Sequence, residues 1–165
     1  MPVTCAIGLG SNLGDPRAQL ARAFEGLSAL PGTRLVARSS LYQSVAVGPT
    51  QPDYLNACAL LHTSLEPLAL LDQLQAIEQA HKRERLTHWG PRTLDLDLLL
   101  YGNQRIDLPR LTVPHAYLCE RNFVLYPLHE IYPQACLPDG RTLASLLEQC
   151  TMKGLSRLET DAPDS

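Results

Sequence analysis

Two aspartates stand two positions apart among leucines in the segment 93–100. In an extended strand, side chains alternate between two faces, so Asp95 and Asp97 point to one side with Cβ atoms roughly 6 to 7 Å apart. The leucines that alternate with them point to the other side: Leu94, Leu96, Leu98 and Leu100. This spacing suits two divalent cations bridged by carboxylate and phosphate oxygens, and it predicts a metal site for displacement at phosphorus. A merely solvated polar face is the alternative.

Basic residues lie upstream of the two aspartates. Arg92 and Trp89 come directly before them, and Lys82, Arg83 and Arg85 come a few positions earlier. Arginine forks bind pairs of phosphate oxygens, and magnesium shares a substrate's phosphates with one or two carboxylates and water. On its own such a stretch is typical of a solvated loop. Beside the paired aspartates it indicates phosphate binding.

The surrounding segments alternate between strand-like and helix-like patterns. Apolar and β-branched runs predict strands over 3–12, 33–44, 54–63 and 93–103. Gly-containing and Pro-containing stretches predict long loops over 45–53 and 81–92. We expect the loops at 44–53 and 81–91 to close over bound ligands and exclude water.

Helical spacing predicts three further elements. A first helix begins at Asp15 and Pro16, which serve as N-cap and first helical residue, and ends at the Pro-Gly of 31–32. The buried face of this helix carries Leu20, Phe24, Leu27 and Leu30.

A second helix, capped by Thr63 or Ser64, contains Pro67 in its first turn and buries Leu71, Leu74 and Ile77. The segment 142–150 predicts a last helix, and 110–115 and 123–131 are short extended or helical pieces. This alternation predicts an α/β domain of two or three layers.

Composition narrows the class of protein. The chain has 165 residues, 45% apolar and 19% charged, with a net charge of −3. We therefore expect one domain over 1–150 with a polar tail over 151–165, and no nucleic-acid partner, because such proteins are usually strongly basic. Five widely spaced cysteines without a CxxC pair argue against a disulfide framework or a zinc site. Short apolar runs and the absence of a signal pattern favour a cytoplasmic protein without membrane association.

Several ordered segments carry a family resemblance. They are AIGLGSNLGDP, SLYQSVAVGPTQPDYLNA, LQAIE, WGPRTLDLDLLLYG, RLTVPH, ERNFVLYPLHEIYP and LPDG, and they span residues 6–140. The chain resembles the 6-hydroxymethyl-7,8-dihydropterin pyrophosphokinase family, and GPRTLDLDLLLYG is the most specific of these segments.

The resemblance implies a ferredoxin-like α/β fold with a mainly antiparallel sheet. It also implies transfer of pyrophosphate from ATP to the hydroxymethyl group of 6-hydroxymethyl-7,8-dihydropterin, which releases AMP in folate biosynthesis. Two Mg²⁺ ions would be held by Asp95 and Asp97, ATP would be the co-substrate, and the enzyme would act as a monomer.

The resemblance also assigns individual positions. Catalytic residues would be Arg83, Arg85, Arg92, Asp95 and Asp97. Contacts to ATP would come from Gln75, Glu78, Arg92, Arg110, Thr112, His115 and Arg121. The pterin pocket would comprise Ser44, Val45, Val47, Tyr54, Asn56, Trp89 and Phe123. Aromatic faces and an amide suit a flat bicyclic ring with hydrogen-bonding edges, although such aromatic residues more often belong to a core.

Three positions depart from the family pattern. Lys82 stands where Gly is usual, Val45 where Pro is usual, and Ala116 where Pro or an aromatic residue is common. None of them removes a metal ligand, but the first two should change the freedom of the loops. The competing interpretation is a non-catalytic paralogue that binds nucleotide or pterin, against which the intact Asp95 and Asp97 argue. An RNA-binding module of similar fold would need a basic face that this acidic chain lacks.

Overall fold

The structure, a computed structural model, describes residues 2–11, 16–44, 54–84, 94–115, 118, 122–150 and 155–157. In chain order the elements are β1 (Val3–Ser11), α1 (Pro16–Ser28), β2 (Thr33–Arg38), β3 (Tyr42–Ser44), β4 (Tyr54–Thr63), α2 (Pro67–Glu84), β5 (Asp95–Tyr101), β6 (Ile106–Leu108), β7 (Leu111–Val113), α3 (Asn122–Ile131), α4 (Leu143–Glu148) and β8 (Leu155–Arg157). Most of the two predicted ligand-closing loops lies outside the described residues. The start of the second predicted loop was wrong, since residues 81–84 continue α2.

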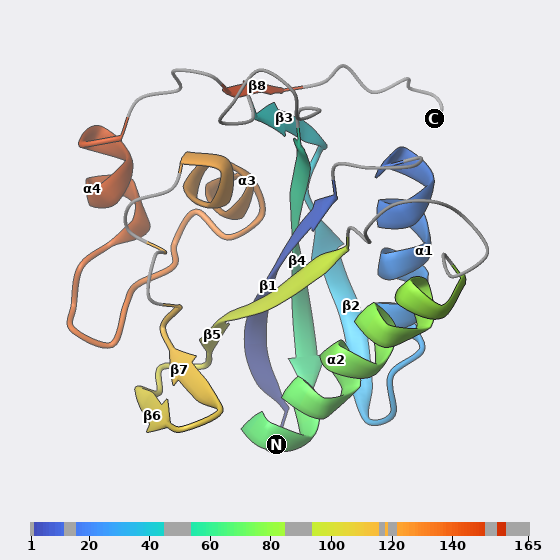
Figure 1. The fold of residues 1–165 in the computed structure, drawn as a ribbon. Coiled ribbons are helices and arrows are strands. Elements are labelled where there is room, and N and C mark those ends of the chain that lie inside the picture. The colour runs from blue at the N-terminus through green and yellow to red at the C-terminus, as the bar shows by residue number, and fades with distance from the viewer. Residues whose placement is uncertain are drawn as a thin grey trace.

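Strand β4 lies in the middle of a six-stranded sheet (Figure 1). It pairs with β1 along one side, from Val3 opposite Thr63 to Ser11 opposite Leu55. On its other side β4 pairs with both β2 and β3. Beyond these, β5 extends the sheet past β1 and β8 extends it past β3, while β6 and β7 form a separate hairpin. Every strand pair in the described part of the chain is antiparallel.

Helices cover both faces of the sheet (Figure 1). Helices α1 and α2 enclose one core, in which Leu20, Leu27 and Leu74 are fully buried. Helices α3 and α4 enclose the second core, which contains Leu125 and Leu128. The result is a three-layer α/β arrangement around a mainly antiparallel sheet. The sequence predicted two or three layers, and the family resemblance implied the mainly antiparallel sheet. No helix in the described ranges is long and apolar enough to cross a membrane.

Helix α2 begins later than the predicted cap. Its first residue is Pro67, whose missing N–H costs nothing at a helix start. The predicted caps Thr63 and Ser64 are wrong because their hydroxyl groups have other partners. The Thr63 hydroxyl accepts a hydrogen bond from the Leu65 amide at 3.0 Å, and the Ser64 hydroxyl donates to the Gly32 carbonyl at 3.2 Å. The Ser64 bond ties the segment before α2 to the turn after α1.

The segment 33–44 forms two strands instead of the single predicted one. At the break, the Ser39 amide donates to the Cys58 carbonyl, and the Cys58 amide donates to the Ser39 hydroxyl, both at 2.9 Å. A side-chain oxygen thus replaces a backbone carbonyl in the pairing with β4. The next amide, of Ser40, turns away to the Glu130 carboxylate of α3. Competition from side-chain hydrogen bonds ends β2 here.

Strand β5 contains an irregularity that corrects one predicted orientation. Ala6 of β1 lies opposite Leu100 and the next residue, Ile7, lies opposite Leu98, so Leu99 is an extra residue in β5. An extra residue reverses the alternation beyond it. Leu99 and Leu100 therefore both face the core under α3 and α4, while Leu98 faces the other core. The prediction that Leu100 shares a face with Leu94, Leu96 and Leu98 was wrong.

Other elements were predicted only in part. The ambiguous segment 123–131 is helix α3 and 110–115 contains strand β7, whereas β6 was not predicted. Helix α4 has the N-cap Thr142, whose hydroxyl accepts from the Ser145 amide at 3.1 Å. Within the stretch predicted as a polar tail, residues 155–157 form β8, and Leu155 is buried.

Candidate active site

The two aspartates lie at the beginning of β5, an outer strand of the sheet. Asp95 is exposed, Leu96 is buried, and the Asp97 side chain is 46% exposed. This alternation confirms the geometric prediction that both carboxylates lie on one face, opposite Leu94, Leu96 and Leu98. In the described part of the chain β5 pairs only with β1, and both α2 and β7 contact β5.

Glycines separate the carboxylates from the next functional strand. Asp95 lies opposite Gly10, which in turn lies opposite Asn56 of β4. Asp97 is related to Cys58 in the same way through Gly8. Paired residues of antiparallel strands point to the same face, so Asp95, Gly10 and Asn56 form one row across roughly 10 Å of sheet, and β1 contributes no side chain to it. Both glycines are buried, and the side chain of Leu99 lies against the face of Gly8.

His115 joins the carboxylate pair from the segment that follows β7. Its backbone amide donates to the Leu99 carbonyl at 3.1 Å, which fixes the chain beside β5. Its imidazole Nε2 then lies 3.9 Å from Asp97 Oδ1, with the His115 side chain 27% exposed. An imidazole at this position can donate a hydrogen bond to an anionic oxygen held near Asp97.

Acceptor groups on α2 face β5 and the β6–β7 hairpin. Glu78 Oε2 accepts a hydrogen bond from the Leu96 amide at 2.7 Å and so ties α2 to the strand that carries both aspartates. Gln75 Oε1 accepts from Arg110 Nη2 at 3.1 Å. Three residues assigned to nucleotide contact by family resemblance are therefore placed along one side of β5.

A hydrogen bond joins two residues assigned to the pterin pocket. The hydroxyl of Ser44, at the end of β3, donates to Asn56 Oδ1 at 2.7 Å, and both side chains are buried. Because the amide oxygen is engaged by this hydroxyl, the amide orientation of Asn56 is fixed. Phe123 lies in the first turn of α3, which packs against β4. Asn56, Asp95 and Asp97 project from the same sheet face, on the side where α3 packs.

The thiol of Cys58 projects from this same face and is fully buried in the core under α3 and α4. Burial raises its pKa far above the usual range of a thiol, and the negative charges of Glu130 and Asp97 raise it further. Such a thiol remains protonated at neutral pH and is a poor nucleophile.

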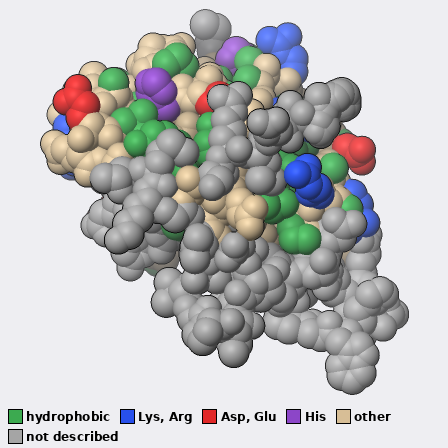
Figure 2. Space-filling model, turned by 90° about the horizontal axis from the view of Figure 1, so that it is seen from above, with side chains coloured by type: hydrophobic (Ala, Val, Ile, Leu, Met, Phe, Trp, Pro, Cys, Tyr) green, Lys and Arg blue, Asp and Glu red, His purple; other side chains and the backbone are tan. Residues whose placement is uncertain are grey.

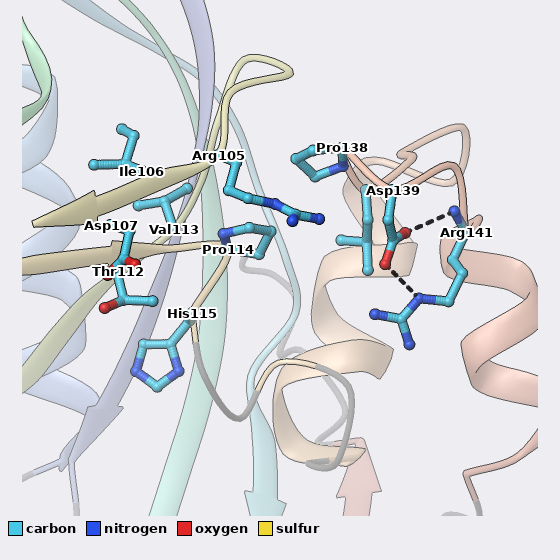
Figure 3. Close-up of a pocket in the computed structure, with 11 residues that line it drawn as sticks. Arg105, Ile106, Asp107, Thr112, Val113, Pro114, His115, Pro138, Asp139 and Arg141 are labelled. Carbon is cyan, nitrogen blue, oxygen red and sulfur yellow. Dashed lines mark hydrogen bonds and ion pairs between the residues drawn. The ribbon is translucent and has the colours of Figure 1, made fainter.

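A pocket of about 350 Å³ opens beside His115 (Figure 3). Thr112 and His115 line it from the hairpin side, and Arg105 reaches toward it from the turn after β5. Opposite, Arg141 Nε donates to Asp139 Oδ2 at 2.9 Å. A hydrogen bond from the Arg141 amide and the guanidinium charge hold the pKa of Asp139 below its usual value. Arg105 and Arg141 were not among the predicted site residues.

Glu130 is a further organising residue that the sequence did not reveal. Its carboxylate accepts from the Ser40 amide at 3.1 Å, and from the Ser40 and Tyr42 hydroxyl groups at 2.9 Å each. These bonds fasten α3 to β3, and β3 carries Ser44. The partners are about 90 positions apart in sequence, so no local pattern could have indicated them.

Several predicted site residues lie outside the described part of the chain. They are Val45, Val47, Arg85, Trp89, Arg92 and Arg121, together with the side chains of Tyr54 and Arg83. Their predicted roles stay predictions. Seen from above, the described acidic, basic and histidine side chains are interspersed on the visible face of the molecule (Figure 2).

The site combines paired carboxylates, an imidazole and several hydrogen-bonding groups on one α/β sheet. Such a combination is typical of enzymes that transfer phosphate-containing groups. Comparison with known proteins identifies the family. Residues 6–133 match the family described as 7,8-dihydro-6-hydroxymethylpterin-pyrophosphokinase (HPPK), and the chain belongs to it. It is an ATP-dependent diphosphotransferase.

Curated relatives support the same assignment. A Pseudomonas aeruginosa protein named 2-amino-4-hydroxy-6-hydroxymethyldihydropteridine pyrophosphokinase is 54% identical over 153 residues, which cover 92% of this chain and 94% of that protein. A Haemophilus influenzae protein of the same name is 49% identical over 148 residues, covering 89% and 92% of the two chains.

A solved structure is similar in fold. It is a wild-type Plasmodium falciparum HPPK-DHPS chain with pterin and p-hydroxybenzoate, which matches with a TM-score of 0.71 at 15% identity. The match covers 97% of this chain but only 47% of that one, so the present chain spans about half of its length. The expectation of a ferredoxin-like α/β fold is confirmed.

Proposed function

We propose that this chain transfers the terminal pyrophosphoryl group of ATP to the hydroxymethyl group of 6-hydroxymethyl-7,8-dihydropterin at the face of β5 that carries Asp95 and Asp97. Membership of the pyrophosphokinase family and the names of its relatives support the reaction. The observation that carries the site is the pair of accessible carboxylates on one face of the sheet. His115 lies beside Asp97, and Asn56 lies in the same row across the sheet as Asp95.

The residues present fit magnesium. Asp95 and Asp97 provide two accessible carboxylates, while no set of three or more acidic, histidine or cysteine ligands occurs among the described residues. Magnesium usually takes one or two carboxylates and completes its shell with water and substrate phosphates. We assign Asp95 and Asp97 as the ligands of two Mg²⁺ ions, which would neutralise phosphate charge and orient the triphosphate when bound.

The remaining residues divide between the two substrates. The nucleotide is proposed to bind along β5 and the β6–β7 hairpin. The described residues there are Gln75, Glu78, Arg110, Thr112 and His115, and Arg92 and Arg121 are proposed to join them. We propose Arg83, Arg85 and Arg92 as further phosphate partners in catalysis. On the pterin side, β3 carries Ser44, β4 carries Asn56 and α3 carries Phe123, and we propose that these three residues bind the pterin. Val45, Val47, Tyr54 and Trp89 are proposed to join them.

The proposed reaction needs positioning more than covalent chemistry from the protein. The pterin hydroxyl oxygen attacks the β-phosphorus of ATP, and the bond from that phosphorus to the α–β bridging oxygen breaks. AMP leaves with the electron pair, and the hydroxyl proton is lost to solvent late in the transfer. His115 donates a hydrogen bond to a phosphate oxygen, and the arginines neutralise charge in a loose transition state.

ATP labelled separately at the β and γ phosphorus tests this assignment. Both labels should move together to the pterin product with stoichiometric AMP, because the two phosphates are transferred as one group. ADP as the main nucleotide product would contradict it. A non-catalytic paralogue would produce neither product, and the names of the relatives do not favour that alternative. We also propose that the enzyme acts as a monomer in the cytoplasm, where ATP is available.

A further inference from the structure

Arg110 is held against α2 by two acceptors. It lies in the turn between β6 and β7, and its Nη2 donates to Asp72 Oδ1 at 2.6 Å and to Gln75 Oε1 at 3.1 Å. The Arg110 side chain is 48% exposed and the Asp72 side chain is 60% exposed. The contact joins elements 38 positions apart in the sequence.

The two acceptors belong to a stripe on α2. Asp72, Gln75 and Glu78 follow at intervals of three residues, so they lie near one another on the helix surface. Each supplies an oxygen to the structure opposite: Asp72 and Gln75 to Arg110, and Glu78 to the Leu96 amide. This stripe therefore sets both the position of β5 and the orientation of the Arg110 guanidinium.

We propose that Asp72 is a positioning residue for nucleotide binding, acting through Arg110. The inference rests on the proposed function, in which Arg110 contacts ATP. An exposed ion pair contributes little to folding stability because water competes for both charges. It still limits the rotamers of a long arginine side chain, and the planar fork has further donors on Nε and Nη1 that are then fixed in direction.

In this arrangement Asp72 and Gln75 orient the Arg110 guanidinium for ATP more than they compete with ATP for it. Both contacts to α2 use the same nitrogen, Nη2, so the two acceptors occupy only one end of the fork. The bond to the carboxylate is charge-assisted and short, whereas the bond to the neutral amide is longer. When Asp72 is removed, only the weaker partner Gln75 remains. The Arg110 side chain must then be ordered when ATP binds, and the entropy lost in ordering it lowers the affinity for ATP.

Steady-state kinetics of Asp72→Ala test the inference. KM for ATP and the Kd of a non-hydrolysable ATP analogue should each rise about two- to fivefold, while kcat and KM for the pterin stay unchanged. Asp72→Asn should give a smaller increase because it keeps an acceptor without the charge. Glu25→Ala, which removes an exposed carboxylate from α1, should change none of these constants.

A double-mutant cycle with Arg110→Ala separates the inference from a general charge effect. Asp72→Ala should add nothing to the loss caused by Arg110→Ala, because the proposed effect passes through that guanidinium. Unchanged or tighter ATP binding in Asp72→Ala, or an equal effect with and without Arg110, would overturn the positioning role. Failure of the wild-type enzyme to form pterin diphosphate would instead reject the proposed function, and the analogue Kd would still report on Asp72.

Discussion

At the scale of residues, the acidic pair is the feature that sequence and structure describe alike. The two-residue period of a strand was enough to place Asp95 and Asp97 on one face, because β5 is regular from Asp95 to Leu98. Contacts such as Arg110 with Asp72, or Glu130 with Ser40, could not be predicted in this way. They depend on how α2, the hairpin, α3 and β3 meet in space, and no short-range pattern encodes those meetings.

Replacing either aspartate with asparagine should separate catalysis from folding. Asp95→Asn or Asp97→Asn keeps the shape but removes a negative charge, so turnover at saturating magnesium should fall by orders of magnitude. Stability without metal should stay the same or rise by up to about 1 kcal/mol, because two neighbouring carboxylates repel one another.

Thermal unfolding without metal and a turnover assay measure both effects. Glu25→Gln on α1 is the matched control and should leave both unchanged. Near-normal turnover in either aspartate variant, or severe unfolding of both, would show that this face is only scaffold.

At the scale of elements, the regular helices and long strands were predictable, and the short pairings were not. Leu20, Phe24 and Leu27 recur at helical spacing and face the core, as predicted. The division of 33–44 into β2 and β3 depends on the Ser39 hydroxyl, which replaces a backbone acceptor. In the sequence, Ser39 cannot be distinguished from an ordinary strand residue. Similarly, Leu155–Arg157 is too short for a periodic signal, and its place in the sheet depends on β3.

Strand β8 should support the pterin side of the site. It pairs with β3 so that Leu155 lies opposite Ser44, and Ser44 holds the Asn56 amide. A chain ending at Cys150 loses this pairing and the buried Leu155 side chain, whose truncation in a core typically costs about 2 kcal/mol or more. We expect a lower melting temperature and a several-fold higher KM for the pterin, with a smaller change in KM for ATP.

A chain ending at Arg157 is the matched control, since it keeps β8 and removes only residues 158–165. It should behave like the full chain in both assays. Equal pterin KM values for the two truncated chains would show that β8 does not support the site.

At the scale of the whole molecule, the sheet separates two cores, and each contains a fully buried thiol. Cys5 belongs to the core under α1 and α2, and Cys58 belongs to the core under α3 and α4. Burial raises the pKa of Cys5 to about 12, and burial together with nearby carboxylates raises the pKa of Cys58 further. Both thiols therefore stay protonated in the folded chain at a pH where the unfolded chain ionises them.

This difference predicts how stability depends on alkaline pH. Below pH of about 8.5, the usual thiol pKa, folded and unfolded chains carry the same thiol protons and the free energy of unfolding is unaffected. Above it the unfolded state loses protons that the folded state retains, so the free energy of unfolding falls by roughly 1 kcal/mol per pH unit for each thiol. The loss continues until the folded thiols ionise, near pH 12 for Cys5.

Urea denaturation at pH 8, 9 and 10 under reducing conditions measures this slope. Cys5→Ala and Cys58→Ala should each be less stable at pH 8, because a buried sulfur is lost, yet each should show a flatter decline with pH than the wild type. Cys136→Ala removes an exposed thiol and should leave the slope unchanged. The comparison cancels the titration of other groups, because each variant differs from the wild type by one thiol. Identical slopes in all four proteins would contradict the prediction, because they would mean that Cys5 and Cys58 ionise as readily in the folded chain as in the unfolded one. Both thiols are buried, on opposite sides of the sheet, and burial disfavours their charged form.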